Sequence, residues 1–327
     1  MLPAVAGAAL LSVALTACST GPQHESLELS GDLTTHDPAL AIEGDDWYVY
    51  STGNGAVADG NIQVRHSDDG EQWEYVGEVW QEKPAWVVEA VDGVDNLWAP
   101  ELVRHDGTWH LYYSASTFGS NTSVIALATN ETLDPDAANY EWVDRGPVIA
   151  SDGDDDFNAI DPGIITDAEG TPWMAFGSFW SGLRMIELEW PSGLRVDHAE
   201  PLRLADRQTP PNAIEAPYIV ERDGWYYLFF SRDSCCRGLG STYNMAVGRS
   251  ETVTGPYLDR EGVPLLQDGG MSLLESEHPQ IGPGGQSVAR VGGVDYLAYH
   301  YYDGDRGGQF TLGIRPIEWV DGWPSID

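Results

Sequence analysis

Three carboxylates in the chain, Asp37, Asp161 and Glu215, stand at matching places in a repeated segment that contains proline. Acids of this kind can act as a pair in hydrolysis, because one protonates a leaving oxygen while the other activates water. Crowded carboxylates raise one another's pKa, so a purely structural protein has reason to keep them apart. A single Asp-Pro step is a common turn former and carries little weight. Recurrence of the acids at equivalent sites indicates a shared catalytic centre.

The segment that carries these acids occurs five times. Each copy has a small or acidic residue before Pro, an apolar pair, a short polar turn and an aromatic strand that ends in small residues. The copies begin at His36-Asp37-Pro38, Trp98-Ala99-Pro100, Ile160-Asp161-Pro162, Glu215-Ala216-Pro217 and, in a degenerate form, Gly285-Gln286-Ser287. The steps between the prolines (Ser287 in the fifth copy) are 62, 62, 55 and 70 residues. Such a period fits four strands with their hairpin turns.

This repeat predicts an all-β fold, a five-bladed β-propeller with four-stranded antiparallel blades, as a single domain over residues 31–327. The first strand of each blade lines the central channel of a propeller. Asp37, Asp161 and Glu215 are therefore expected to converge at one end of that channel. Ala99 and Gln286 occupy the corresponding places in the two remaining blades.

Composition limits the partners of such a domain. The chain has 327 residues, 42% of them hydrophobic, and 16 basic against 52 acidic residues give a net charge of −36. A surface this negative repels phosphates, which excludes nucleic acid as a partner, whereas a neutral polysaccharide is indifferent to the field. Adaptation to salt and simple solubility both account for the charge. No GxxxxGK[ST], HExxH or GxSxG pattern occurs. We expect a monomer.

The N-terminal residues indicate export. Residues 4–17 are apolar and too short to span a bilayer, and they lead into Leu15-Thr16-Ala17-Cys18, which resembles a lipobox. Residues 1–18 are therefore predicted to be a lipoprotein-type signal peptide and residues 19–30 a polar tether. Membrane contact is expected only through a lipid anchor at Cys18. No basic residue precedes the apolar stretch, so an ordinary cleaved signal remains the alternative.

The two other cysteines, Cys235 and Cys236, are adjacent. An ordinary disulfide joins residues whose Cα atoms are well separated, so a bond between neighbours would close a strained ring. The sequence leaves the state of these cysteines open, and the fold is not expected to depend on disulfides.

The segments around the acids resemble glycoside hydrolase family 43, and within it the endo-1,5-α-L-arabinanases. Matching segments are, in chain order, residues 36–38, 97–101, 116–123, 158–163, 177–182, 214–218, 299–303 and 313–317. A single tripeptide would be a weak match. The number and order of these segments, which extend over nearly the whole chain after residue 36, make the resemblance specific.

The resemblance implies an extracellular inverting hydrolase that cleaves internal α-1,5 bonds of arabinan, a neutral plant polysaccharide. Asp37 matches the general base, Glu215 the general acid, and Asp161 the residue that tunes the pKa of the acid and orients it. Inversion leaves room for a water, so the carboxyls of Asp37 and Glu215 are expected to lie roughly 6.5–9.5 Å apart.

Other positions match sugar-contacting residues of the family: Trp98, Gly119, Asn158, Ala159, Ile160, Asp161, Ser178, Phe179 and Trp180. For Phe179 and Trp180, packing in the core is the alternative. His300 matches a histidine that binds calcium, or a similar divalent ion, in the central channel, mostly through waters. Residues 152–156 are acidic, but Phe157 and Gly163 depart from a calcium-loop pattern, and we interpret the segment as a solvated loop.

Two alternatives share the fold. An exo-acting arabinofuranosidase or β-xylosidase would use the same carboxylates, but it closes one end of the cleft with long loops or a further domain. The chain ends soon after the last copy of the repeat, which favours an open groove and endo cleavage. A non-catalytic glycan-binding propeller would keep the aromatic residues but has no need of three acids.

Overall fold

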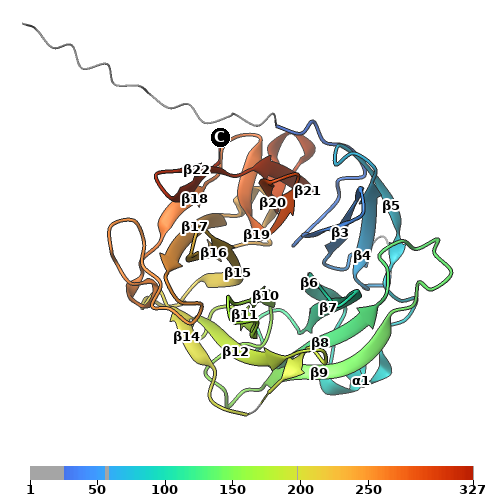
Figure 1. Cartoon of the computed structure of the whole chain (residues 1–327), viewed down its shortest axis with the longest axis horizontal. Coiled ribbons are helices and arrows are strands. Elements are labelled where there is room, and N and C mark those ends of the chain that lie inside the picture. The colour runs from blue at the N-terminus through green and yellow to red at the C-terminus, as the bar shows by residue number, and fades with distance from the viewer. Residues whose placement is uncertain (1–25, 56–58, 197, 327) are drawn as a thin grey trace, which may run out of the picture.

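Five β-sheets surround a central axis and form a five-bladed propeller (Figure 1). The computed structural model describes residues 26–55, 59–196 and 198–326. The innermost strands of the blades are β2 (Ala39–Glu43), β6 (Leu97–His105), β10 (Gly163–Thr166), β15 (Ile214–Arg222) and β19 (Gln280–Val291). Each of these strands contacts the next, and β19 contacts β2, so the ring is closed. The predicted five-bladed propeller is confirmed.

Blades II and IV have the predicted four antiparallel strands. Blade II continues from β6 with β7 (Thr108–Ala115), β8 (Ser123–Asn130) and β9 (Val143–Ser151). Blade IV continues from β15 with β16 (Trp225–Arg232), β17 (Asn244–Ser250) and β18 (Met271–Leu274).

The other three blades depart from four strands. Blade I continues with β3 (Asp46–Ser51), β4 (Gln63–Ser67) and β5 (Gln72–Glu78), and β1 (Ser30–Gly31) joins β5 in parallel. Blade III continues with β11 (Pro172–Phe176) and β12 (Leu183–Glu189), to which both β13 (Leu194–Arg195) and β14 (Leu202–Ala205) pair. Blade V has only β20 (Val294–Asp303) and β21 (Gln309–Pro316) beyond β19. Its outer edge is occupied by the N-terminal segment, because the N–H of Leu312 donates to the carbonyl of Leu33.

Short elements complete the described chain. They are helix α1 (Ala85–Ala90), the 3-10 helices η1 (Gly238–Gly240), η2 (Leu265–Gln267) and η3 (Gly304–Arg306), and the hairpin of β22 (Glu318–Val320) and β23 (Trp323–Ser325). The hairpin packs against the core between blades IV and V. No helix in the described part of the chain has the length and apolar character needed to cross a membrane.

The core lies between neighbouring blades, and inner strands such as β3 and β8 bury both of their faces. Side chains alternate along a strand. In β3, Tyr48 and Tyr50 pack into the cluster shared with blade II, whereas Trp47 and Val49 pack into the cluster shared with blade V. The aromatic strand that recurs in the sequence is thus the second strand of each blade, and its alternation holds adjacent blades together.

The predicted signal peptide, Cys18 and most of the predicted tether lie outside the described residues. The last residues of that tether belong to the propeller, since Leu27 and Leu29 pack against the core between blades I and V and Ser30 pairs with Gln72. The ordered domain therefore begins before residue 31.

A disulfide joins Cys235 and Cys236 in the loop between β16 and β17. Because the bond links adjacent residues, it holds no two elements of the fold together. The packing of the blades does not depend on it, as expected.

Candidate active site

The residue before the repeated Pro has a left-handed backbone in every blade. The φ angles are +50° at Asp37, +42° at Ala99, +60° at Asp161, +52° at Ala216 and +59° at Gly285. Such angles are uncommon for residues other than glycine. The equivalent residue in the fifth copy is therefore Gly285, not Gln286 as predicted. Gln286 takes the place of the proline, and without a proline the register of this copy could not be read from the repeat.

The N–H of each of these left-handed residues donates to a side chain of the preceding blade. The acceptors are Thr52 Oγ1 for Ala99 (2.8 Å), Ser114 Oγ for Asp161 (3.0 Å), Ser231 Oγ for Gly285 (3.0 Å) and His300 Nδ1 for Asp37 (3.1 Å). In three of these steps a hydroxyl residue at or next to the end of the repeated aromatic strand therefore fixes the start of the next blade, and His300 does so at the step from blade V to blade I.

The step from blade III to blade IV breaks this rule. Here the N–H of Ala216 donates to Asp161 Oδ2 at 3.2 Å, although Ser178 ends the preceding aromatic strand. The Ser178 hydroxyl donates instead to Glu215 Oε2 at 2.6 Å. Asp161 and Ser178 together hold residues 215–216 at the mouth of the channel.

Asp37 is held as an ionised carboxylate. Burial raises its pKa, but the charge and hydrogen bond of His36, the charge of His300 and the hydroxyl of Thr52 outweigh burial and hold the pKa well below its usual range. Oδ2 lies 2.8 Å from His36 Nδ1 and accepts from Thr52 Oγ1 at 2.7 Å. The side chain of Asp37 remains 21% exposed, so it is open to water and substrate.

The pKa values of Glu215 and Asp161 are raised, opposite to that of Asp37. Burial raises the pKa of Glu215, and the charge of Asp37 adds to this, although hydrogen bonds from Ser178 and Tyr243 lower it. Burial raises the pKa of Asp161 well above its usual value, and the carboxylates of Glu215 and Asp37 raise it further, while the N–H of Ala216 lowers it. Because the two groups interact, they titrate as a pair that retains a proton more readily than an isolated acid.

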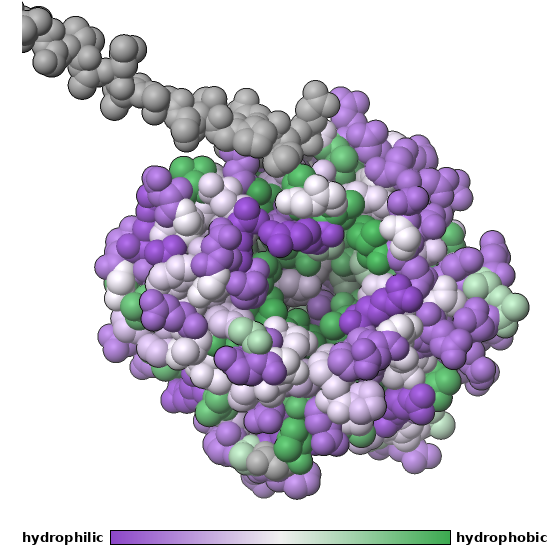
Figure 2. Space-filling model, in the orientation of Figure 1, coloured by the Kyte–Doolittle hydropathy of each residue, from purple (hydrophilic) through white to green (hydrophobic). Residues whose placement is uncertain are grey.

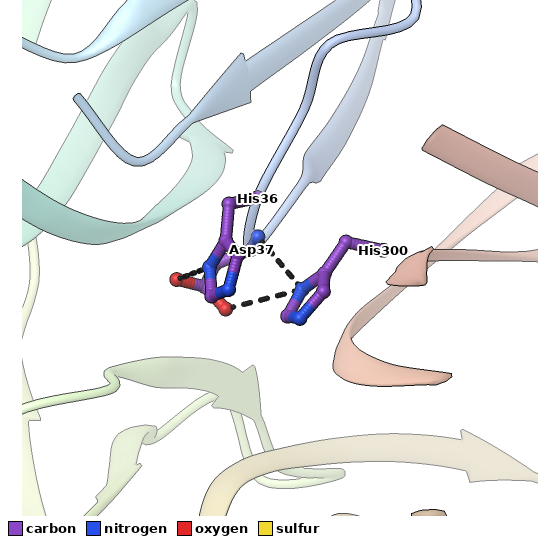
Figure 3. Close-up of side chains that lie close together, drawn as sticks. All are labelled: His36, Asp37 and His300. Carbon is purple, nitrogen blue, oxygen red and sulfur yellow. Dashed lines mark hydrogen bonds and ion pairs between the residues drawn. The ribbon is translucent and has the colours of Figure 1, made fainter. Parts of the chain in front are cut away.

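Two histidines flank Asp37 (Figure 3). The rings of His36 and His300 stack with centroids 3.6 Å apart, and with Asp37 they form a group whose ligand atoms lie within 4.8 Å of one another. His300 is fully buried, and burial, with the charge of His36, lowers its pKa well below the usual value although Asp37 raises it. His300 Nε2 has no hydrogen-bond partner among the described residues. Because Nδ1 accepts from the N–H of Asp37, a neutral His300 carries its hydrogen on Nε2, which suits a hydrogen bond to a water in the channel.

The channel contains a fourth carboxylate that the sequence did not single out. Glu101, on β6 of blade II, is 4% exposed and lines an axial cavity of about 30 Å³ together with Tyr218 and Ser287. Burial raises the pKa of Glu101 well above its usual value. The visible face of the propeller is hollowed at its centre, with apolar side chains on the walls and a hydrophilic rim (Figure 2).

Two of the predicted substrate-contacting residues, Trp98 and Trp180, are accessible at the surface. Trp98 precedes the left-handed Ala99 as Glu215 precedes Ala216, and it is partly exposed. Trp180 is 39% exposed, and both Trp180 and its neighbour Phe179 have positive φ. Contact of these residues with sugar remains a prediction.

The other predicted contacts differ in accessibility. Asn158, Ala159 and Ile160 are buried, and Asn158 Oδ1 accepts from Ser123 Oγ at 2.7 Å. Gly119 is exposed and has a φ of +82°. Residues 152–155 form exposed turns, whereas Asp156 makes an ion pair with the buried Arg184 at 2.7 Å. The acidic loop is therefore solvated over most of its length and anchored at its end.

Sequence reasoning missed three side chains that support the acids. Tyr243 is buried beside Glu215 and hydrogen bonds to it, Thr52 donates to Asp37, and Tyr302 contacts His36. Thr52 follows the small residue that ends the first aromatic strand, so the repeat contained a signal for it. Tyr243 directly precedes β17 of blade IV and reaches Glu215 through the packing of that blade, whereas Tyr302 lies on β20 of blade V and reaches His36 only in the folded ring.

The five-bladed propeller thus has, at its channel mouth, a carboxylate with a lowered pKa and a coupled pair of carboxyls with raised pKa, which are the groups that a carbohydrate-cleaving enzyme needs. Residues 31–324 match glycosyl hydrolases family 43, and the chain belongs to this family and is a glycosidase. The resemblance seen in the sequence is confirmed.

The similar proteins are arabinan-active enzymes by name. The chain is 40% identical to an extracellular exo-α-(1→5)-L-arabinofuranosidase of Cellvibrio japonicus, over 89% of this chain and 86% of that protein. It is 36% identical to extracellular endo-α-(1→5)-L-arabinanase 1 of Bacillus subtilis, over 97% and 95% of the two chains. The structure of a family 43 endo-arabinanase from Bacillus licheniformis superposes with a TM-score of 0.84 at 37% identity, covering 91% of this chain and 99% of that one.

Proposed function

We propose that this protein is an exported arabinanase that hydrolyses internal α-1,5-L-arabinofuranosidic bonds with inversion at the anomeric carbon. The observation that carries the proposal is the division of protonation states at the channel mouth. The pKa of Asp37 is lowered, whereas those of Glu215 and Asp161 are raised. An inverting glycosidase needs this combination of one base and one acid.

In the proposed reaction Asp37 removes a proton from water, and that water attacks the anomeric carbon. The two hydrogen bonds from His36 and Thr52 fix the direction of its carboxylate. Glu215 protonates the leaving oxygen, and its raised pKa keeps the proton available near neutral pH. Asp161 accepts the N–H of Ala216, and as the other member of the coupled pair it opposes loss of the proton that the pair retains.

We also propose that His300 binds a divalent cation, calcium by expectation, in the channel. Its ring is fully buried and its Nε2 has no hydrogen-bond partner among the described residues, which supports a contact to the ion through a water. A single imidazole is a poor site for so hard an ion, so waters must supply most of its ligands. Bound there, the ion would supply positive charge and ordered water beside Asp37.

Exo cleavage is the second candidate, since relatives with either mode of action are about equally similar to this chain. The two modes are separated by following linear arabinan. An endo enzyme lowers the viscosity steeply while few reducing ends appear, whereas an exo enzyme releases short products at almost constant viscosity.

Export is supported by the extracellular relatives and by the signal-like residues 1–18. Lipid attachment at Cys18 is a finer proposal. Cys18→Ser should release the protein from the membrane fraction if the anchor exists, and an unchanged distribution contradicts the anchor alone.

One experiment tests the proposed reaction. Proton NMR of the first product released from α-linked arabinan should show the β-anomer, and Glu215→Gln should abolish this product. The same variant should retain far more activity on an aryl arabinofuranoside with a good leaving group, which needs little acid help. Initial α-product would mean that Asp37 is a nucleophile, and equal loss on both substrates would mean that Glu215 is not the acid.

A further inference from the structure

The disulfide between Cys235 and Cys236 lies beside the candidate active site, and hydrogen bonds connect it to Asp37. The N–H of Cys236 donates to Tyr302 Oη at 2.7 Å, and Tyr302 Oη lies 2.9 Å from His36 Nε2. His36 Nδ1 lies 2.8 Å from Asp37 Oδ2. The sulfur of Cys236 is itself 3.9 Å from His36 Nε2. These contacts join a loop of blade IV, strand β20 of blade V and the start of blade I.

Only the first of these hydrogen bonds has a fixed direction. A backbone N–H can only donate, so the oxygen of Tyr302 accepts from Cys236. Tyr302 Oη has a second lone pair and a hydroxyl hydrogen, so it can bond to His36 Nε2 in either tautomer. His36 Nδ1 faces the Asp37 carboxylate (Figure 3). Displacement of the Cys236 amide would therefore disturb the contacts that hold His36 against Asp37.

The disulfide holds this amide in an unusual place. Cys236 has a φ of +66°, which is unfavourable for a residue with a side chain. The ring closed by the disulfide contains the backbone of both cysteines and restricts their torsions.

The rest of the loop is fixed without the disulfide. The N–H of Thr242 donates to the Ser234 carbonyl at 2.9 Å, and the N–H of Ser234 donates to Thr242 Oγ1 at 3.2 Å. Breaking the S–S bond therefore frees the Cys236 amide while the base of the loop stays closed.

We propose that the Cys235–Cys236 disulfide is a redox-sensitive positioning element for the Asp37 carboxylate, acting through Tyr302 and His36. The proposal rests on the proposed function, in which Asp37 activates water. A dithiol supplies two electrons and two protons, the S–S bond breaks, two thiols form, and the dithiol becomes a disulfide. Cys236 can then leave its positive φ, and its N–H withdraws from Tyr302. Outside the cell the bond persists, because that environment is oxidising.

The test compares the oxidised and reduced forms of the full chain. The protein is treated with dithiothreitol, and alkylation followed by peptide mass analysis shows that Cys235 and Cys236 have become thiols. We expect kcat to fall about tenfold with KM changed less than about twofold, because misplacement of a catalytic group costs up to about 100-fold. The fall should be equal on linear arabinan and on an activated aryl arabinofuranoside, since both need water activation. Reoxidation should restore kcat, and the thermal midpoint records whether the fold is intact.

Variants locate the path of the effect. The double variant Cys235→Ser/Cys236→Ser should have the kcat of the reduced enzyme and no response to dithiothreitol. Tyr302→Phe should also have a low kcat, and reduction should lower it no further. Tyr301→Phe is the matched control, since Tyr301 packs against the core between blades IV and V and should keep both kcat and the response.

Several outcomes would overturn the proposal. If protein whose two thiols are alkylated keeps its full kcat, reduction has no effect on the reaction. If the effects of Tyr302→Phe and of reduction on kcat multiply, reduction does not act through Tyr302. Amide hydrogen exchange gives a readout that needs no substrate: Cys236 should be protected when oxidised and exposed when reduced, and equal protection contradicts the inference. An oxidised enzyme without activity on arabinan would instead refute the proposed function.

Discussion

Replacing Ser178 with alanine removes a hydrogen-bond donor from Glu215 and should make that acid harder to ionise. The Ser178 hydroxyl lies 2.6 Å from Glu215 Oε2, and the carboxyl is 8% exposed, so water cannot fully replace the lost donor. A hydrogen bond that stabilises the carboxylate lowers its pKa. Its loss therefore raises the pKa, and the alkaline limb of the pH–rate profile should move to higher pH.

The size of this shift follows from the strength of the bond. Hydrogen bonds to charged groups contribute about 1.5–3 kcal/mol. One pKa unit corresponds to about 1.36 kcal/mol, so the loss amounts to about one to two units. Tyr243 also hydrogen bonds to Glu215 and remains in the variant, which places the expected shift nearer one unit. The maximum rate should fall only modestly, because Glu215 still carries its proton.

The assay is kcat/KM on linear arabinan across the pH range, which reports the ionisation of the free enzyme. Ser250→Ala is a suitable control, since Ser250 is also buried but lies at the end of β17 and caps a turn through its bond to Thr252. Its profile should match the wild type. An alkaline limb of Ser178→Ala that stays in place or moves to lower pH would refute the assignment of that limb to Glu215.

Three further changes test the rest of the channel. Asp161→Asn keeps an oxygen that accepts the Ala216 N–H but removes an ionisable group. The alkaline limb of the pH–rate profile should therefore move to lower pH by about one unit, the opposite direction to that of Ser178→Ala. If the limb does not move, Asp161 does not tune the pKa of Glu215. His300→Ala should lose the bound divalent ion in elemental analysis and lower the thermal midpoint, whereas His278→Ala, at an exposed site, should do neither; full metal content in the variant would show that His300 does not hold the ion. Glu101→Gln should raise the thermal midpoint by about 2 °C or more at pH 7 and little at pH 4. The folded state retains a proton on Glu101 that the unfolded chain releases above its ordinary pKa, so stability falls as pH rises, and a pH-independent difference would contradict this.

Most of the fold was predictable because each blade repeats one local pattern. The Pro at the start of a strand and the aromatic strand that follows mark four of the copies, and these define the closed ring. The departures come from tertiary effects. Blade V has three strands because residues near Leu33 occupy its outer edge, and that contact joins the two ends of the sequence. Local pattern cannot reveal a pairing at such a separation.

The carboxylates were predictable for the same reason, whereas their environment was not. Asp37 and Asp161 share a place in the repeat, yet the pKa of the first is lowered and that of the second raised. The difference comes from His36 and His300 beside Asp37 and from Glu215 beside Asp161. His300 reaches Asp37 only because blade V closes on blade I.

One of the five steps between blades departs from the regular hydrogen-bond pattern, and this step lies at the candidate active site. At four of the five steps between blades, a side chain from the second strand, or next to its end, accepts the N–H at the start of the next blade. At the step from blade III to blade IV, Ser178 does not accept this N–H but donates to Glu215. Asp161 accepts the N–H of Ala216 instead. The exchange places an ionisable group where a neutral hydroxyl would suffice for folding. Departures from a local rule are expected at functional sites, because a sequence selected only for stability has no reason to make them. The break in the repeat thus involves the two residues proposed as the acid and its supporting carboxyl, and it is visible without reference to any related protein.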